Sequence, residues 1–261
     1  MKKNKNFIIV SLLVLYCSIN LSAQDSASVK IYDKLLKKYV HNGLVDYVNL
    51  TKDKGLNSYI NALSKFNPNT LTSNEDKLAF WINAYNAYTL KVIVDNYPVS
   101  SINDLHSGGR IIGHILKTTV WDKDFVVINN KNMTLNEIEH EIIRPKFKDP
   151  RVHFALVCAA VSCPPLRNEA FVGEKLNEQL NDQGKIFLSD QSKNSFDVKN
   201  KIADLSKILD WFGSDFGNNN TQILLRIKEY LPKQISESLD ANIINWDINF
   251  KTYNWELNKV N

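Results

Sequence analysis

One stretch of this sequence is apolar around the whole circumference of a helix, and it constrains the fold more than any other feature. Large apolar side chains occupy every side of the run 78–97, namely Phe80, Trp81, Ile82, Tyr85, Leu90 and Ile93. Protein must surround such a helix, because no side of it is suited to water. Ser73, three residues before Asp76, resembles the start of a capping box, and Pro98 predicts the end. We therefore expect a buried central helix over about residues 74–97.

Asn83 and Asn86 are the polar exceptions within this apolar helix. Spaced by three residues, they share one helix face. Buried side-chain amides need hydrogen-bond partners. The backbone of a neighbouring loop is the favoured partner, and a bound ligand is the alternative that would make both residues binding residues.

Apolar spacing and turn residues divide the remainder of the chain into short elements. The spacing predicts further helices at 28–39, 56–66, 135–143, 174–188, 205–212 and 224–231. Extended segments are predicted at 44–48, 125–128, 152–158 and 196–202, and a turn at 108–109. The strands are scattered among the helices, which disfavours a doubly wound sheet. We predict an α+β fold, a helix-rich single domain around a small sheet.

The first residues have the features of a signal peptide. A short basic segment precedes an apolar run from Phe7 to Tyr16, and a polar taper ends at the small residue Ala23. The apolar run is shorter than the roughly 20 residues that cross a bilayer, which disfavours a retained anchor. Bulky Tyr16 disfavours lipid attachment at Cys17. We expect cleavage after Ala23 and export to the periplasm or the medium.

Composition and charge narrow the classes of partner. Cleavage would leave 238 of the 261 residues, a length that suits one globular domain over 24–261. Three leader lysines account for most of the formal net charge of +4. The mature chain is therefore nearly neutral and has no dense basic stripe, which argues against nucleic-acid binding. No later segment predicts stable membrane insertion, so the expected partner is a small molecule or a peptide.

The segment 151–166, Arg-Val-His-Phe-Ala-Leu-Val-Cys-Ala-Ala-Val-Ser-Cys-Pro-Pro-Leu, carries the most chemical information. Its apolar run 152–158 predicts a strand buried in the middle of a sheet. Cys158 closes that strand, and Cys163 opens a stiff Pro-Pro turn, where scaffolds commonly display reactive groups. Four residues separate the cysteines, and no second close pair completes a zinc site, so we predict no metal and no cofactor.

Three interpretations of these two thiols remain open. They are structural, either joined in a disulfide or buried as apolar side chains. Alternatively, one of them is a nucleophile that a histidine activates. A redox role is the third interpretation, although four intervening residues exceed the tight spacing of a thioredoxin-type motif.

His140 is the histidine that best suits pairing with a thiol. On the helix 135–143 it lies off the apolar face and groups with Glu137, Glu141 and Arg144 at helical spacing. A carboxylate beside an imidazole is the arrangement of an oriented general base. A solvated helix face with ion pairs is the alternative explanation of the same grouping.

The predicted catalytic residues are Cys163, His140 and Glu141, with Cys158 and His153 as alternates. Cys163 is preferred because a residue at a proline turn is easier to expose than one that closes a buried strand. His153 lies five residues before Cys158, so in a regular strand their side chains point to opposite faces. A core hydrogen bond is the expected role of His153.

Several motifs resemble the domain of unknown function 547 family. They are Phe80-Trp-Ile-Asn-Ala-Tyr-Asn-Ala87, Leu135-Asn-Glu-Ile-Glu-His140, Arg144-Pro145, the segments 149–158 and 162–167, the later segments 205–211 and 215–216, and the flanks 43–47 and 253–258. The resemblance covers nearly the whole mature chain. Asn254 departs from the terminal motif, which more usually has aspartate there, and so removes the charge for an ion pair.

The resemblance implies exported bacterial members of this size and plant members joined to coiled-coil segments that suggest scaffolding. It implies no reaction. Both cysteines, His140 and His153 fall on motif positions, as do the candidate binding residues Asn83, Asn86, Arg144 and Arg167.

We therefore expect an uncharacterised exported protein that acts as a thiol-dependent hydrolase or transferase through a Cys/His dyad. The alternative is a non-catalytic binding or scaffold module with structural or disulfide-bonded cysteines. A dyad requires free thiols and a short distance between Cys163 and His140, whereas a stable disulfide favours the binding module.

Overall fold

The computed structural model describes residues 26–107 and 119–260. The predicted signal peptide with its cleavage site and the turn predicted at 108–109 lie outside the described residues. No helix within the described ranges has the length and apolar character needed to cross a bilayer.

Short helices form most of the described chain. The α-helices are α1 (Ser26–Tyr39), α2 (Tyr47–Leu50), α3 (Gly55–Lys65), α4 (Asn74–Asn96), α6 (Arg144–Phe147), α7 (Leu176–Ser189), α8 (Ile208–Trp211), α9 (Gly213–Phe216), α10 (Asn220–Ile227) and α11 (Lys233–Asn242). A π-helix covers Glu137–Ile143, and 3-10 helices cover Pro68–Thr70, Ile102–Leu105, Val120–Asp122, Pro150–Phe154, Gly173–Lys175, Lys228–Tyr230 and Ile243–Asn245.

The strands form separate small sheets in place of the single small sheet expected from the sequence. The strands are β1 (Val40–His41), β2 (Leu44–Val45), β3 (Val126–Ile128), β4 (Lys131–Met133), β5 (Ser195–Asp197), β6 (Ile202–Leu205) and β7 (Asp247–Phe250). The first four strands form two antiparallel pairs, while β6 pairs antiparallel with β5 and parallel with β7. The fold is α+β, as predicted.

Helix α4 is the buried central helix that the sequence predicts. Its side chains are buried almost continuously from Leu78 to Leu90. The hydroxyl of Ser73 accepts a hydrogen bond of 3.0 Å from the backbone N–H of Asp76, which caps the helix start as expected. The end at Asn96 precedes Pro98, whose ring cannot continue a helix.

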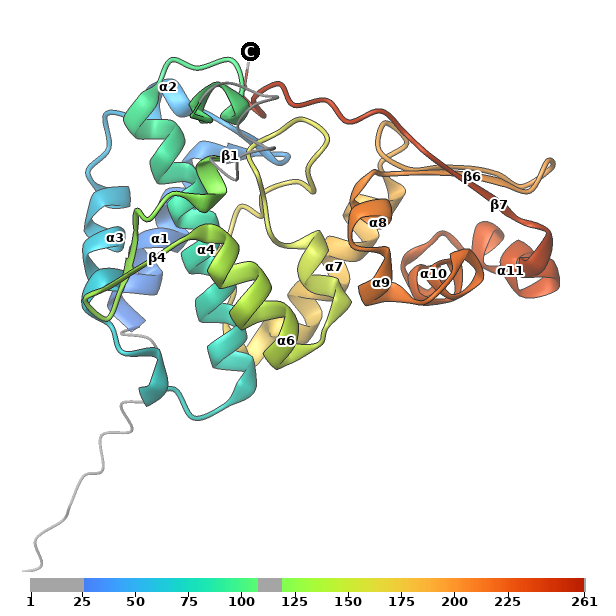
Figure 1. Cartoon of the computed structure of the whole chain (residues 1–261), viewed down its shortest axis with the longest axis horizontal. Helices are drawn as coiled ribbons and strands as arrows, with labels where there is room; N and C mark the ends of the chain where they lie inside the picture. Colours follow the sequence, from blue (N-terminus) through green and yellow to red (C-terminus); the bar gives the residue numbers. More distant parts are fainter. Residues whose placement is uncertain (1–25, 108–118, 261) are drawn as a thin grey trace, which may run out of the picture.

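Two hydrophobic clusters share helix α7. Its first half contributes Leu176 and Leu180 to the cluster around α4, and its second half contributes Phe187 and Leu188 to a cluster with α8, α10 and α11. Figure 1 shows α1, α3 and α4 on one side, α9, α10 and α11 on the other, and α7 between them. The shared helix therefore joins the two parts of the core.

The C-terminal segment 251–260 connects the far sheet back to the first helices. After β7 it runs across the molecule towards β1 (Figure 1). On the way, Val161 donates its backbone N–H to the carbonyl of Glu256 at 2.8 Å, and Asn258 donates its N–H to Ala159 at 3.0 Å. Val45 in β2 then donates its N–H to Asn258 at 2.8 Å. The last residues of the chain thus cover the loop that contains the cysteines.

The strand predicted at 152–158 is wrong, although the burial of this run is as expected. A 3-10 helix covers Pro150–Phe154, and irregular chain follows. The side chain of Asn86 accepts the N–H of Val157 and donates to the carbonyl of Ala155, both at 2.9 Å. An amide from α4 therefore supplies the backbone partners that a neighbouring strand would have supplied.

Other boundaries in the second half of the chain also differ from the predictions. The segment 196–202 is not one strand, because β5 and β6 are joined by a turn at 198–201. Leu205 ends β6, so only Ile208–Trp211 of the predicted helix 205–212 is helical. Helix α11 and strand β7 were not predicted from the sequence pattern.

Candidate functional site

A pocket of about 220 Å³ brings together both cysteines and both histidines singled out from the sequence. Its lining residues come from α4, the 3-10 helix Val120–Asp122, the stretch 136–140 at the start of the π-helix, the cysteine segment 151–166, the stretch 208–212 that contains α8, and the C-terminal segment. They are Tyr85, Trp121, Asn136, Glu139, His140, His153, Leu156, Cys158, Cys163, Ile208, Trp211, Phe212, Tyr253 and Trp255. The pocket is thus built from residues up to 170 positions apart in the chain.

His153 is the buried histidine of this pocket and has a carboxylate partner. Its Nε2 lies 2.7 Å from Oδ2 of Asp215, which comes from α9. The hydrogen bonds from His153 and from Arg144, whose Nε lies 2.6 Å from the same oxygen, hold the pKa of Asp215 well below its usual range. Burial lowers the pKa of His153 despite the attraction of Asp215. A neutral His153 therefore donates its Nε2–H to Asp215 and keeps Nδ1 as an acceptor.

His140 lies at the exposed side of the pocket and is held by Arg144. A terminal nitrogen of Arg144 lies 2.9 Å from Nδ1 of His140, and the guanidinium is the donor because arginine has no acceptor. Burial and the charge of Arg144 lower the pKa of His140. The ring of Phe212 stacks on His153 at 4.1 Å and faces His140 at 6.3 Å. Arg144 and Phe212 therefore position both imidazoles.

Glu139 is a buried carboxyl group that the sequence reading overlooked. Residues 137–143 form a π-helix, whose wider turn buries Ile138, Glu139 and Ile143. An α-helix over this stretch would instead place Ile142, four residues after Ile138, on the buried face. Burial raises the pKa of Glu139 to about 7, and the hydroxyl of Tyr85 forms a hydrogen bond with its carboxyl group. The pocket thus contains an acid that exchanges its proton near neutral pH.

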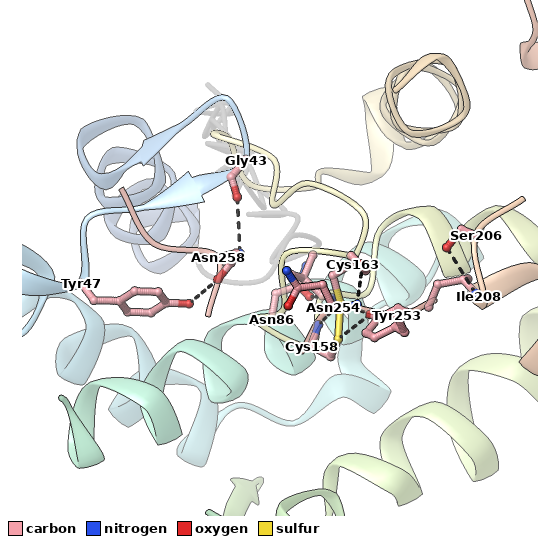
Figure 2. The surroundings of a disulfide bond; sticks show 12 residues. Gly43, Tyr47, Asn86, Cys158, Cys163, Ser206, Ile208, Tyr253, Asn254 and Asn258 are labelled. Atoms are coloured by element: carbon pink, nitrogen blue, oxygen red, sulfur yellow. Dashed lines mark hydrogen bonds between the residues drawn. A yellow bond between two sulfur atoms is a disulfide. The ribbon is translucent and has the colours of Figure 1, made fainter. Parts of the chain in front are cut away.

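Cys158 and Cys163 are joined in a disulfide, with Cα atoms 6.2 Å apart. Figure 2 shows the hydroxyl of Tyr253 directed at both sulfurs, at 3.1 Å from Cys158 and 3.2 Å from Cys163. The backbone N–H of Cys158 also donates to the sulfur of Cys163 at 2.9 Å. Neither cysteine is a free thiol in this state, so the dyad of Cys163 and His140 is not formed in it.

The preference for Cys163 as the exposed cysteine is wrong. Only 2% of Cys163 is exposed, whereas Cys158 is partly exposed. The C-terminal segment covers the proline turn, because Ser162 donates its N–H to the carbonyl of Asn254 and accepts the N–H of Asn254 on its hydroxyl. A proline turn is exposed only where nothing packs over it. Asn254 makes these contacts through its backbone, which an aspartate would retain.

Aromatic rings form one wall of the pocket. Tyr253 packs against Trp255 with ring centroids 4.5 Å apart, and both rings contact Trp211, which is 45% exposed. Trp121 extends this wall with its centroid 5.9 Å from that of Trp255. Rings of this kind offer flat apolar surface with a polar edge. Glu139, His140 and His153 line the same pocket as this wall.

The remaining predicted site residues lie outside the pocket lining. Asn83 exchanges two hydrogen bonds with the backbone of Phe171, at 2.7 and 2.9 Å, and Asn86 binds the cysteine segment. Both amides therefore serve a loop backbone, in line with the favoured interpretation. Arg167 pairs with Glu169, and Glu141 is exposed on the π-helix. The carboxylate that orients an imidazole is Asp215, not Glu141.

Asp215, Tyr253 and Trp255 are site residues to which the sequence analysis assigned no role. Each stands in a motif of the family resemblance, in the segments 215–216 and 253–258. Their position in family motifs was the sequence feature that could have identified them as site residues. No local pattern in the sequence connects these segments to the cysteines. Within the described residues, no three His, Cys, Asp or Glu side chains are grouped so that they could hold a metal ion.

Comparison with known protein families matches part of the chain to a described family. The profile of the family described as "Protein of unknown function, DUF547" matches residues 68–188. No curated protein and no solved structure matches the chain significantly. The matched range is narrower than the resemblance inferred from motifs, since the segments from 205 onwards and the flank at 43–47 lie outside it. The chain thus resembles the DUF547 family over residues 68–188, the segment that supplies both cysteines and both histidines of the pocket.

Proposed function

We propose that this pocket binds a small, uncharged organic molecule with a flat apolar face. The aromatic wall of Trp121, Trp211, Tyr253 and Trp255 carries this proposal, because such rings bind flat apolar surfaces. A pocket with apolar walls and a few polar groups on one side is the usual form of a small-molecule site. With this function the protein is a binding module whose cysteines are joined in a disulfide.

Charge supports an uncharged ligand. Among the described residues that line the pocket, none is lysine or arginine, so an anionic ligand would lack a direct cationic partner. Burial favours the uncharged forms of Glu139, His140 and His153, because it raises the pKa of the acid and lowers the pKa of both imidazoles. These three groups are well suited to donate and accept hydrogen bonds at the polar edge of a neutral ligand.

The test is a screen of small fragments by saturation-transfer-difference NMR on the purified chain. The panel contains neutral ring compounds, neutral saccharides and carboxylates of matched size. We expect neutral fragments to bind and Trp211→Ala to weaken their binding. Ile244→Ala is the matched control, since it removes an apolar side chain that is 79% exposed and outside the pocket. Preferential binding of the carboxylates, or equal effects of both substitutions, would refute the proposal.

A thiol-dependent hydrolase or transferase is the second candidate function. One observation favours it: both cysteines line the same pocket as His140 and His153. This function requires that the disulfide be reduced first. After reduction, rapid iodoacetamide labelling of one cysteine near pH 7, slowed by His153→Ala or His140→Ala, would support it. Slow labelling that neither substitution changes would exclude it.

We also propose that the protein is exported. The basic and apolar leader supports this proposal. The disulfide also supports it, because disulfides form and persist in oxidising compartments. Intact-mass measurement of the protein from the periplasm or the medium should give a chain that begins at Gln24. Recovery of the protein with residues 1–23 still attached would contradict it.

A further inference from the structure

The two cysteines of the disulfide both line the pocket but differ in their exposure. Cys158 is partly exposed, whereas 2% of Cys163 is exposed. Figure 2 shows the sulfur–sulfur bond beside Tyr253, a residue of the pocket wall. Because Cys158 is the more exposed cysteine, we expect a molecule bound against that wall to meet Cys158 first. Steric access therefore selects Cys158 as the sulfur that is attacked.

The two sulfurs also differ in the hydrogen bonds that they accept. The backbone N–H of Cys158 donates to the sulfur of Cys163 at 2.9 Å and is the donor that distinguishes the two sulfurs. The hydroxyl of Tyr253 serves both, at 3.1 Å from the sulfur of Cys158 and 3.2 Å from that of Cys163. Burial raises the pKa of Tyr253, so this hydroxyl keeps its proton and remains a donor. Both donors would stabilise a negative charge on Cys163 if the disulfide opened. Thiol–disulfide exchange is faster when the leaving sulfur is stabilised as a thiolate.

We propose that this disulfide exchanges with a small uncharged organic thiol that binds in the pocket. The thiol loses its proton to solvent, and its thiolate attacks the sulfur of Cys158. A new bond forms between those two sulfurs, the bond between Cys158 and Cys163 breaks, and its electron pair leaves on Cys163. A second thiolate then attacks the substrate sulfur of this mixed disulfide, the bond from that sulfur to Cys158 breaks, and its electron pair leaves on Cys158. An organic disulfide is released, and both cysteine thiolates take protons from solvent. Two thiols are oxidised and one protein disulfide is reduced.

The aromatic wall sets the class of thiol. It would hold the body of the substrate, so this inference rests on the proposed binding function. Benzyl mercaptan, which has a neutral ring, should react about tenfold faster than 2-mercaptoethanol, because burial of a ring in the pocket adds binding energy to the exchange.

The experiment identifies which cysteine receives the thiol. The full chain is mixed with benzyl mercaptan, quenched at short times with acid and then alkylated, and its peptides are analysed by mass spectrometry. The expected result is a benzylthio adduct on Cys158 and an alkylated Cys163. An adduct on Cys163, equal adducts on both cysteines, or a disulfide that stays intact would overturn the proposal.

A substitution at Tyr253 tests the role of its hydroxyl. Tyr253→Phe keeps the ring in the wall and removes one donor to Cys163, so the exchange rate should fall about tenfold. Tyr88→Phe is the matched control, because it removes a hydroxyl that binds the carbonyl of Val127, away from the sulfurs. Equal rates for the two variants would contradict the role of the Tyr253 hydroxyl in stabilising the leaving thiolate, and the site of the adduct decides separately which sulfur leaves.

Binding of benzyl alcohol separates this inference from the proposed function. Benzyl alcohol has the ring but no thiol, and its binding is measured through the intrinsic tryptophan fluorescence of the full chain. If benzyl alcohol binds and no adduct forms, the exchange activity is refuted and the binding function stands. If an adduct forms on Cys158 at the same rate for both thiols and benzyl alcohol does not bind, the proposed binding function is refuted.

Discussion

Replacement of Glu139 by glutamine should make the protein relatively more stable as the pH rises. Glu139 is 7% exposed, and burial raises its pKa from about 4.5 to about 7. Arg144 opposes this rise and Asp215 adds to it, but burial is the largest cause. Between pH 4.5 and about pH 7, Glu139 therefore keeps its proton in the folded state but has lost it in the unfolded state. The contribution of this group to stability is complete below pH 4.5 and is lost as the pH rises through about 7.

The magnitude follows from the size of the shift. A change of one pKa unit corresponds to about 1.36 kcal/mol, so a shift from about 4.5 to about 7 corresponds to about 3 kcal/mol. Glutamine keeps the shape of the side chain and an oxygen that can accept from Tyr85, but it cannot ionise. The free energy of unfolding of Glu139→Gln, relative to the unsubstituted protein, should therefore increase by about 3 kcal/mol between pH 4.5 and pH 8.

Urea denaturation at the two pH values measures this difference. Glu141→Gln is the control, because it makes the same substitution at an exposed position of the same π-helix, so the difference between the two variants isolates the effect of burial. The comparison cancels any loss of packing, since packing does not change with pH. A relative stability of Glu139→Gln that is equal at pH 4.5 and pH 8 would show that Glu139 is solvated in the folded protein.

Two further substitutions test the packing around α4 and α7. Asn83→Leu leaves the backbone N–H and carbonyl of Phe171 without partners and should lower the free energy of unfolding by about 1–3 kcal/mol. Asn96→Leu at the exposed end of α4 is the control and should change it little. Equal melting temperatures for the two variants would refute the buried role of Asn83. Gly184→Ala places a Cβ atom 2.8 Å from the ring of Tyr230, and the crowding should lower stability by about 1–3 kcal/mol despite the better helix propensity of alanine. Lys185→Ala, at an exposed position of α7, is its control, and a stabilised Gly184→Ala protein in thermal melts would contradict the close packing.

Local sequence signals were sufficient to predict the central helix, whereas an apolar stripe at helical spacing mispredicted most of the segment 205–212. The central helix was predicted over 74–97 and occupies Asn74–Asn96, because its cap and its closing proline are local signals. The need for backbone partners at Asn83 and Asn86 also followed from sequence, since an amide inside an apolar helix must be satisfied. Which loops satisfy them is decided by the tertiary structure, through contacts 69 to 88 residues away.

The run 152–158 shows where local pattern fails. Its apolar character predicted burial correctly, but a strand and an irregular buried segment have the same composition. Hydrogen bonds from Asn86 on α4 stabilise the irregular conformation over a strand. The residues of the run itself do not indicate that this side chain lies beside them. The π-helix at 137–143 is a similar case, because one extra residue in a turn exchanges Ile142 for Ile143 on the buried side and encloses Glu139.

The sequence by itself determined the α+β class, the buried central helix and the two residue types, cysteine and histidine, on which a site would depend. Only the tertiary structure decided how these residues meet. Asp215 reaches His153 from 62 residues away, and Tyr253 reaches Cys158 from 95 residues away. The C-terminal segment also decides which cysteine is covered, because it packs over the proline turn. Local sequence patterns show which side chains avoid water. The site depends instead on contacts between segments far apart in the chain, and their separation in sequence does not predict their distance in space.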